Sequence, residues 1–313
     1  MERKMWLDKP YYSLDAYLKE TYGEKVYKVS LQGGMTCPNR DGTLDDRGCI
    51  FCSAGGSGDF AAPRRECVTQ QIDEAIAGIR KAKTVGNKFI AYFQSYTNTY
   101  APVAYLRKLF MEAISHPQIV GLSIGTRPDC LPQEVLDLLA ELNQIKPVWV
   151  ELGLQTIHQR TASLIRRGYP LSVFEQAVRN LNAIGVQVIV HVILGLPFES
   201  KAEMLQTVSY LSKGADWHIE GLKLQLLHVL RGTDLERMLP YFKTFTLEKY
   251  VALILECIER VPQNIVIHRI TGDGPKALLL EPEWSKHKKH VMNTIHKEMK
   301  QRDCWQGKQW TQS

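Results

Sequence analysis

The chain has 313 residues, a formal net charge of +6, and 44% hydrophobic and 23% charged residues, which is ordinary for a soluble globular protein with one large core. No apolar run approaches the roughly 18 residues of a membrane-spanning helix. The N-terminus, MERKMWLDKPYYSL, is more polar than a signal peptide, and seven cysteines, an odd number, suit a reducing compartment. We therefore expect a cytoplasmic protein with no membrane partner.

Runs rich in β-branched residues alternate with amphipathic stretches along the middle of the chain. Several runs, such as VQVIVHVIL, are apolar at nearly every position, which is typical of parallel strands buried on both faces. The alternation predicts an α/β fold with helices over a parallel sheet, and six repeats favour a partial (β/α)6 barrel over an open sheet. The predicted strands are Lys25–Gln32, Phe89–Ser95, Val120–Gly125, Val148–Gln155, Val186–Leu194, Gly221–Val229 and Asn264–Ile270. The predicted helices are Cys67–Ala82, Val103–Ile114, Pro132–Leu142, Leu171–Ala183, Lys201–Lys213 and Leu247–Val261.

Three cysteines follow the first predicted strand. Cys37, Cys49 and Cys52 lie in TCPNRDGTLDDRGCIFC, a C-x11-C-x2-C pattern. Three thiolates can hold three irons of a 4Fe–4S cluster and leave the fourth iron open. An open iron can chelate the amino and carboxylate groups of S-adenosylmethionine (SAM) and pass an electron to its sulfonium. Phe51 lies between the last two cysteines, where an aromatic face suits an adenine ring.

Two other uses of these cysteines stay open from the residues alone. A disulfide with a spare thiol needs an oxidising compartment, which the absence of a secretory signal does not favour. A structural zinc site needs a fourth ligand, for which Cys67 and His158 are the candidates. The chain offers no second C-x-x-C or H-x-x-x-H pair, so the pattern favours the cluster.

Polar, glycine-containing strings follow the predicted strands. In a parallel barrel the carboxyl ends of the strands meet at one face, where the active site lies. Each string alone is consistent with a simple turn, but together they indicate the lining of a site. The strings are QSYTNTYAP, GTRPD, GLQT, GLPFES, LRGTD and TGDGPK.

The C-terminal segment is basic, and we predict a helix there from about Pro282 to Arg302. The helix is either an ordinary solvated face or a surface that binds phosphates. Its cations, extending just past the helix, are Lys286, Lys288, Lys289, Lys297, Lys300, Arg302 and Lys308, with His287, His290 and His296 among them, against Glu298 and Asp303. Trp284, Trp305 and Trp310 lie near its ends.

The ordered strings resemble the radical SAM superfamily, and within it the group of the elongator catalytic subunit and the oxygen-independent coproporphyrinogen oxidase. The matching pieces over about residues 25–240 are TCPNRDGT…GCIFC, TRPD, VELGLQT, RRGY, HVILGLP and RGTDLE. YFQSYTNTYAP, HVILGLP and HRITGDGP resemble the YtqA/YhcC-type (MnmL-like) family over nearly the whole chain. The resemblance implies residues 1–24 as an N-terminal extension, 25–240 as a radical SAM core, and 241–313 as an extension that completes the barrel edge.

The resemblance also implies which residues bind the cofactors, a 4Fe–4S cluster and SAM. Cys37, Cys49 and Cys52 would hold the cluster, and Phe51 would pack on the adenine. Gln94 and Ser95 would recognise the methionyl amino group. Gln155 and Arg167 match the residues that relatives use for the ribose and the carboxylate, with Arg166 as the alternative arginine. His191 stands where some relatives carry an acidic ribose partner; Glu151 is either that partner or a buried structural residue.

Candidate substrate contacts come from the strand-end strings. Arg127 and Asp129 are either substrate contacts or an internal salt bridge between loops. The remaining candidates are Asn98, Tyr100, Arg231, Asp273 and Lys276.

The resemblance implies an enzyme that cleaves SAM to a 5′-deoxyadenosyl radical and modifies the wobble uridine of tRNA, converting its 5-carboxymethylaminomethyl group, with or without 2-thiolation, to 5-aminomethyl. A carboxylate on such a substrate would pair with Arg127, Arg231 or Lys276. A flipped base would stack on Tyr96, Tyr100 or Trp217. Besides tRNA, an electron donor such as flavodoxin or ferredoxin would be a partner. The alternatives are a radical SAM enzyme acting on a small molecule or protein, and a non-catalytic iron–sulfur protein that binds tRNA.

Overall fold

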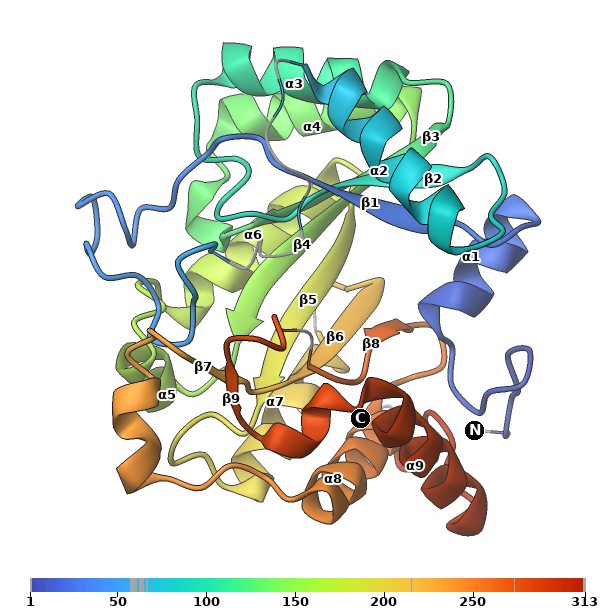
Figure 1. Ribbon diagram of the computed structural model, residues 1–313, viewed down its shortest axis with the longest axis vertical. Coiled ribbons are helices and arrows are strands. Elements are labelled where there is room, and N and C mark those ends of the chain that lie inside the picture. The colour runs from blue at the N-terminus through green and yellow to red at the C-terminus, as the bar shows by residue number, and fades with distance from the viewer. Residues whose placement is uncertain are drawn as a thin grey trace.

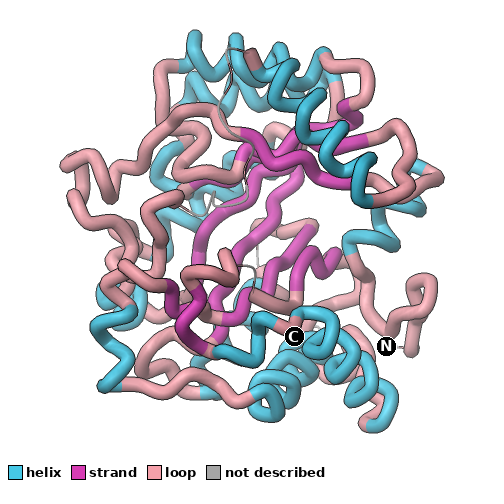
Figure 2. The backbone as a smooth tube through the Cα atoms, in the orientation of Figure 1, coloured by secondary structure: helices cyan, strands magenta, loops and turns pink. Residues whose placement is uncertain are grey.

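The computed structural model describes residues 2–56, 61, 65, 67–214, 216–272 and 274–311. Seven parallel strands form one curled sheet in the order β1-β2-β3-β4-β5-β6-β8, with helices on its outer side (Figures 1 and 2). This half-barrel confirms the predicted fold. Its strands are β1 (Tyr27–Leu31), β2 (Phe89–Phe93), β3 (Ile119–Thr126), β4 (Val148–Gln155), β5 (Gln187–Leu194), β6 (Gly221–Leu226) and β8 (Val266–Arg269). The helices are α1 (Leu14–Tyr22), α2 (Val68–Ala82), α3 (Val103–Ser115), α4 (Gln133–Ile145), α5 (Gln159–Leu164), α6 (Leu171–Ala183), α7 (Lys201–Leu211), α8 (Leu247–Arg260) and α9 (Lys288–Gln301), with short 3-10 turns η1 (Pro128–Cys130), η2 (Glu236–Tyr241) and η3 (Glu283–Lys286).

All seven predicted strands are present, but two predicted elements have wrong bounds. The strand predicted to end at Val229 ends at Leu226; β7 (Val229–Leu230) then leaves the sheet and pairs antiparallel with β9 (Leu279–Glu281). The basic C-terminal helix was predicted as one piece. It is divided at His287, whose backbone leaves the helical region (φ −97°, ψ 56°). The η3 turn, which precedes α9, is attached to the backbone at Phe245, because the Trp284 indole donates a 2.8 Å hydrogen bond to the Phe245 carbonyl. Helices α1 and α5 were not predicted.

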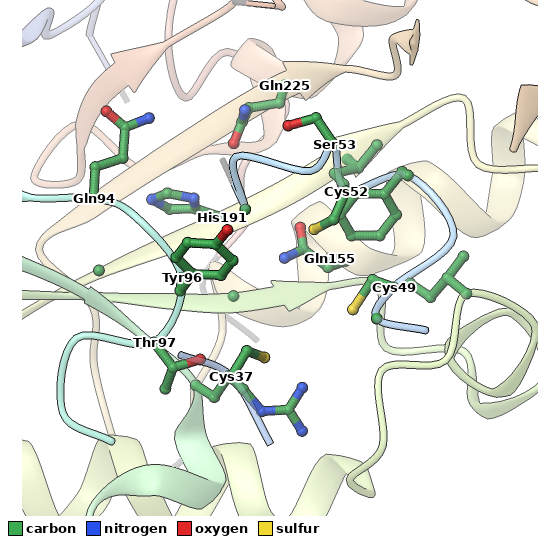
Figure 3. A pocket seen from close by; sticks show the side chains of 18 of the residues that line it. Cys37, Cys49, Cys52, Ser53, Gln94, Tyr96, Thr97, Gln155, His191 and Gln225 are labelled. Carbon is green, nitrogen blue, oxygen red and sulfur yellow. The ribbon is translucent and has the colours of Figure 1, made fainter. Parts of the chain in front are cut away.

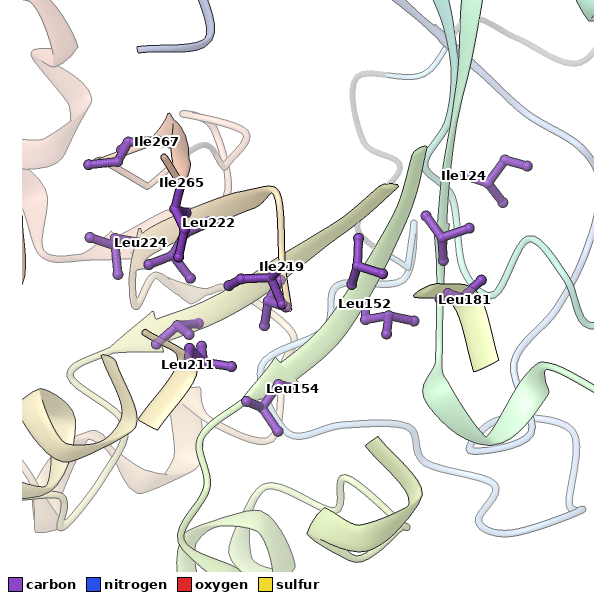
Figure 4. Close-up of a cluster of buried hydrophobic side chains, with 14 of the residues drawn as sticks. Ile124, Leu152, Leu154, Leu181, Leu211, Ile219, Leu222, Leu224, Ile265 and Ile267 are labelled. Atoms are coloured by element: carbon purple, nitrogen blue, oxygen red, sulfur yellow. The ribbon is translucent and has the colours of Figure 1, made fainter. Parts of the chain in front are cut away.

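The side chains of each strand alternate between the helices and the barrel interior. On β4 and β6, leucines such as Leu152, Leu154, Leu222 and Leu224 face outward into the main apolar core under the helices (Figure 4). The residues between them face inward and are mostly polar. The strands are therefore buried on both faces, as predicted. One face is covered by apolar packing under the helices, and the other faces the barrel interior with mostly polar side chains.

The amino-terminal end of the barrel is closed by an apolar layer. Ile90, Trp149 and Ile189, from three strands, pack with Leu18 of α1. Tyr17 on the same helix contacts the Trp149 ring at 5.9 Å between centroids. The N-terminal segment thus closes the bottom of the barrel rather than lining its open end.

One contact between side chains on non-adjacent strands shows that the sheet is curled. Lys28 of β1 reaches Glu151 of β4, with 2.6 Å between Nζ and Oε1, although β2 and β3 lie between these strands. Neighbouring strands are about 4.8 Å apart, so in a flat sheet the two backbones would be about 14 Å apart. The curl shortens this separation, brings inward-facing side chains together and creates a lumen.

The C-terminal helix α9 packs on α8 through Val291, Ile295 and Met299, while its lysines face outward. In Figure 1, α9 lies beside the N-terminal segment, on the opposite side of the molecule from the cysteine loop. The buried side chain of Gln306 links the C-terminal segment to Tyr12 and Ile265. It accepts a hydrogen bond from the Tyr12 amide and donates one to the Ile265 carbonyl. Among the described helices, none is long and apolar enough to cross a membrane.

Candidate cofactor and substrate pocket

A pocket opens at the carboxyl ends of the parallel strands and extends down into the lumen. It lies between the cysteine loop after β1 and the loop after β8. The predicted site residues that line it are Cys37, Cys49, Phe51, Cys52, Gln94, Arg127, Glu151, Gln155, Arg167 and His191. Ser95, Asn98, Tyr100, Asp129, Arg231 and Lys276 are outside this lining, and Asp273 lies outside the described residues.

The three motif cysteines lie around one end of the pocket (Figure 3). A hydrogen bond with Cys52, supported by the nearby Arg127 charge, lowers the pKa of the Cys49 thiol to about 7, whereas the same contact and burial raise the pKa of Cys52. The Asn39 amide also donates to the Cys49 sulfur at 3.4 Å. A thiol that loses its proton near neutral pH is suited to bind a metal, because the thiolate is the ligand.

The state of the cysteines bears on the disulfide alternative. All seven cysteines are free thiols, so the disulfide alternative has no support. Within the described part of the chain, no three His, Cys, Asp or Glu side chains converge on one metal position.

Two predicted SAM residues, Ser95 and Gln155, have buried polar atoms without a hydrogen-bond partner among the described residues. Gln155 projects into the pocket from the end of β4, its Oε1 has no partner, and its backbone is left-handed, with φ of 67° (Figure 3). Such strain in a non-glycine residue is typical of functional sites. Phe51 and Gln94 line the same pocket. The open Gln155 acceptor and the aromatic ring of Phe51 fit a polar ligand with a ring system.

Arg167 is the buried member of the arginine pair. Its guanidinium donates four hydrogen bonds, to the carbonyls of Leu154, Thr156 and Tyr169, and so fixes the loop after β4. Arg166 instead pairs with Asp234, at 2.5 Å. In this arrangement Arg167 supports the pocket wall; its predicted contact with a carboxylate stays a prediction.

Glu151 is the centre of a polar cluster inside the lumen. Its Oε1 accepts hydrogen bonds from Lys28 (2.6 Å) and Ser123 (2.7 Å). Its Oε2 accepts from Tyr92 (2.8 Å), from His191 Nε2 (2.7 Å) and from Lys223. These five donors come from five strands, as expected if Glu151 is a buried structural residue. A contact of Glu151 or His191 with the ribose of SAM stays a prediction.

Burial and charge shift the pKa values in this cluster in opposite directions. For Glu151, burial acts to raise the pKa, but the Lys223 and Lys28 charges and the His191 hydrogen bond hold it well below its ordinary value. Burial, opposed by Glu151 and reinforced by Lys28, lowers the pKa of Lys223 to about 7. Burial and the Lys223 charge lower the pKa of His191 to about 4. The cluster therefore holds an ionised carboxylate, a neutral imidazole and a lysine that titrates near neutral pH.

Two of the predicted substrate residues form an internal ion pair. Arg127 Nε and Nη2 donate to the two carboxylate oxygens of Asp129 at 2.9 and 2.7 Å. The sequence was consistent with either an internal salt bridge or substrate contacts for these two residues, and the structure shows the salt bridge. Asn98 is fully buried and donates to the Phe93 and Gly125 carbonyls, which ties β2 to β3.

The remaining predicted contacts lie at the pocket mouth or away from it. The Tyr100 hydroxyl is 2.9 Å from Thr43 Oγ1 in the cysteine loop. Arg231 and Lys276 are exposed on adjacent loops, joined by a 2.8 Å hydrogen bond from the Arg231 amide to the Leu278 carbonyl. Trp217 cannot stack on a base, because it is 6% exposed and its ring packs against Phe174 and Tyr210.

Sequence reasoning missed the inward-facing residues Lys223, Gln225 and Arg269, all of which line the pocket. A register shift on β8 pairs Leu222 with Ile267 and Lys223 with Arg269, and so places the two cations on neighbouring strands. The available signal was a polar residue at every second position of GLKLQL, within a strand otherwise apolar. That pattern indicates a polar lumen on one face of the strand.

The model of the Radical SAM superfamily matches residues 46–211, and that of the Radical_SAM C-terminal domain matches residues 219–301. The protein YtqA of Bacillus subtilis, itself uncharacterised, is 44% identical over 303 residues, covering 96% of this chain and 93% of that protein. The protein YhcC of Escherichia coli is 38% identical over 274 residues, 87% of this chain and 86% of that protein. A tRNA uridine(34) acetyltransferase of Methanocaldococcus infernus is 25% identical over 164 residues, 52% of this chain and 30% of that protein.

Among solved structures, the archaeal Elp3 of Methanocaldococcus infernus superimposes with a TM-score of 0.68 at 18% identity, covering 90% of this chain. The chain spans 64% of the length of that structure, so the likeness shows a shared fold for the common part. The family match covers more than half of the chain, and YtqA and YhcC both exceed 30% identity over most of their length. The chain belongs to the radical SAM superfamily of enzymes.

Proposed function

We propose that this protein is a tRNA-modifying radical SAM enzyme that converts 5-carboxymethylaminomethyluridine, with or without a 2-thio group, to 5-aminomethyluridine at the wobble position. The observation that carries the radical chemistry is the meeting of three cysteines, Phe51 and the unpartnered Gln155 oxygen in one pocket. Cys37, Cys49 and Cys52 would hold the 4Fe–4S cluster. When bound, the cluster and SAM supply a 5′-deoxyadenosyl radical that abstracts a hydrogen atom.

The chain's own residues would position the reactants and keep water out. Phe51 offers its ring to the adenine, and Gln94 and Gln155 offer amides to the polar parts of SAM. The apolar layer around Trp149 and Leu18 closes the far end of the lumen, so the pocket is accessible from its mouth. A closed end protects a reactive species from side reactions.

The choice of tRNA rests on the relatives and on the mouth of the pocket. One relative is named for acetylation of uridine 34 in tRNA, and the superimposed archaeal structure is an Elp3. Arg231 and Lys276 are exposed cations beside the mouth, where phosphates of an anticodon loop would pass. Tyr96 lines the pocket and Tyr100 lies beside the cysteine loop, so either ring can meet a flipped base.

The test is an anaerobic reaction of the reconstituted protein with SAM, dithionite and tRNA from cells that lack the protein. Digested nucleosides and 5′-deoxyadenosine are both quantified by mass spectrometry. Loss of the carboxymethyl group together with SAM cleavage, absent in Cys52→Ala, is the expected result. SAM cleavage with unchanged nucleosides would redirect the search to a small-molecule or protein substrate. A bound cluster with neither reaction would support a non-catalytic iron–sulfur protein.

A further inference from the structure

The backbone of Asn39 closes the loop between the first two motif cysteines. Eleven residues separate Cys37 from Cys49, and closing a loop of this length costs conformational entropy. The Asn39 carbonyl accepts a 2.6 Å hydrogen bond from the Gly48 amide, which ties a residue just after Cys37 to the residue just before Cys49. The Arg40 amide donates to the Cys37 carbonyl at 2.8 Å and turns the chain at the first cysteine. These bonds fix where the two ends of the loop lie relative to each other.

The side chain of Asn39 contacts the second cysteine directly. It is 1% exposed, and its Nδ2 donates to the Arg166 carbonyl at 2.6 Å and to the Cys49 sulfur at 3.4 Å. A carbonyl oxygen only accepts hydrogen bonds, so the contact with Arg166 requires the amide nitrogen, rather than the amide oxygen, on this side. Gly168 leaves room for the amide oxygen, because a Cβ there would lie 2.9 Å from Asn39 Oδ1. The orientation of the amide is therefore determined on both sides.

These contacts suit a metal-bound sulfur at Cys49. As a thiol, Cys49 donates to the Arg166 carbonyl, with 3.6 Å between Sγ and the oxygen. A thiolate that binds iron has lost this proton, so its sulfur and the carbonyl oxygen would face each other as two acceptors. The Asn39 amide has two N–H groups and can donate one to each of them. The structure therefore already supplies a donor for the ligated form of Cys49.

We propose that Asn39 is a positioning residue for the cluster: it orients the Cys49 sulfur and raises the reduction potential of the cluster through its hydrogen bond to that sulfur. This inference rests on the proposed function, in which Cys49 holds one iron. One-electron reduction adds negative charge that is shared with the ligand sulfurs. A hydrogen-bond donor to a ligand sulfur therefore stabilises the reduced form more than the oxidised form.

The arginines close to the cysteines act in a different way. Arg40 Nη2 donates to the Cys52 carbonyl at 3.1 Å, and Arg127 donates to both carboxylate oxygens of Asp129. These two side chains influence the thiols through their charge. The Asn39 amide is neutral and its contact with the sulfur is directional, so it can be removed without changing the charge of the site.

The decisive measurement is the reduction potential of the cluster in anaerobically reconstituted protein without SAM, from a dithionite titration followed by electron paramagnetic resonance. Asn39→Leu removes the donor and keeps an uncharged side chain of similar shape. It should lower the equilibrium constant for one-electron reduction by about three- to tenfold, as expected for one hydrogen bond, which is a shift of about 30–60 mV to more negative potential. Thr43→Val is the matched control, because it removes an exposed hydrogen bond of the same loop, to Tyr100, that does not involve a sulfur. It should leave the equilibrium constant within about twofold of the wild type.

A second measurement needs no substitution. In the reduced wild type, with ¹⁵N in the side-chain amides of its asparagines, pulsed electron paramagnetic resonance should detect a ¹⁵N coupling to the cluster. If Asn39→Leu holds too little iron for a titration, this coupling decides, and its absence from the wild type overturns the inference.

The other outcomes separate this inference from the proposed function. A potential of Asn39→Leu that matches the wild type overturns the inference alone. So does an equal shift in Thr43→Val, which would mean that loop closure rather than the sulfur contact sets the potential. The expected shift without conversion of tRNA would reject the proposed function and leave the role of Asn39 standing. A wild type that binds no iron overturns both.

Discussion

Lys223 on β6 donates a hydrogen bond to Glu151 on β4, across the intervening strand β5. In a flat sheet these two strands would be about 10 Å apart, so the contact depends on the curl that also makes the lumen. The same carboxylate holds Lys28 from the other direction, at 2.6 Å. Glu151 thus links the two sides of the half-barrel through one buried charge.

Replacing Glu151 should therefore destabilise the whole barrel. Glu151→Gln keeps the shape but leaves Lys28 and Lys223 as buried cations without their counter-charge. The expected loss in the free energy of unfolding is about 3–5 kcal/mol. The measurement is anaerobic guanidinium denaturation followed by circular dichroism. Glu256→Gln, which removes a partly exposed partner of Lys201, is the control and should cost no more than about 1 kcal/mol. Equal losses in the free energy of unfolding of the two variants would show that the buried Glu151 contributes no more to stability than the partly exposed Glu256.

The three motif cysteines should be the ones that hold iron. Cys37→Ala, Cys49→Ala and Cys52→Ala are each expected to reduce bound iron from about four per chain to a small fraction, because each would anchor one iron of the cluster. Iron analysis and electron paramagnetic resonance after anaerobic reconstitution measure this. Cys67→Ala changes an exposed thiol outside the pocket and should retain the iron. Full iron loading in any of the three motif variants would contradict the assignment.

Phosphate contacts with RNA should map to the mouth of the pocket rather than to α9. Arg231→Gln combined with Lys276→Gln should weaken binding of an anticodon stem-loop and reduce the slope of log K against log salt by about 0.7–0.9 per lost contact. The matched control is Lys297→Gln with Lys300→Gln, which removes the same charge from exposed positions of α9. Fluorescence anisotropy at several salt concentrations measures both. A larger effect of the α9 pair would instead assign RNA binding to the basic C-terminal helix.

Local pattern was enough for much of the fold and for the cysteine end of the pocket. The seven apolar runs became the seven strands of one parallel sheet, because β-branched runs buried on both faces are compatible with few other arrangements. The cysteine spacing located the three thiols that surround one end of the pocket. Less local features were not found: α1 was not predicted, and Trp217, one of three rings suggested for stacking on a base, is buried beside Phe174.

The substrate end of the pocket required the tertiary structure. The sequence indicated Arg127 and Arg231 as candidate substrate contacts, because each lies in a polar string after a strand. In the structure Arg127 is paired with Asp129, and Arg231 is exposed at the mouth of the pocket. Lys223 and Arg269, each in an apolar strand, give little sign in the sequence of facing a common space.

The sequence by itself determined the alternation of strands and helices, the spacing of the three motif cysteines and the family, since these depend on neighbours a few residues apart. Only the tertiary structure decided which charges meet in the lumen. Lys28, Glu151 and Lys223 are separated by 123 and 72 residues in sequence, and only the curl of the sheet brings them within hydrogen-bonding distance. Contact across strands depends on curvature, and curvature is a property of the packed sheet rather than of any one strand.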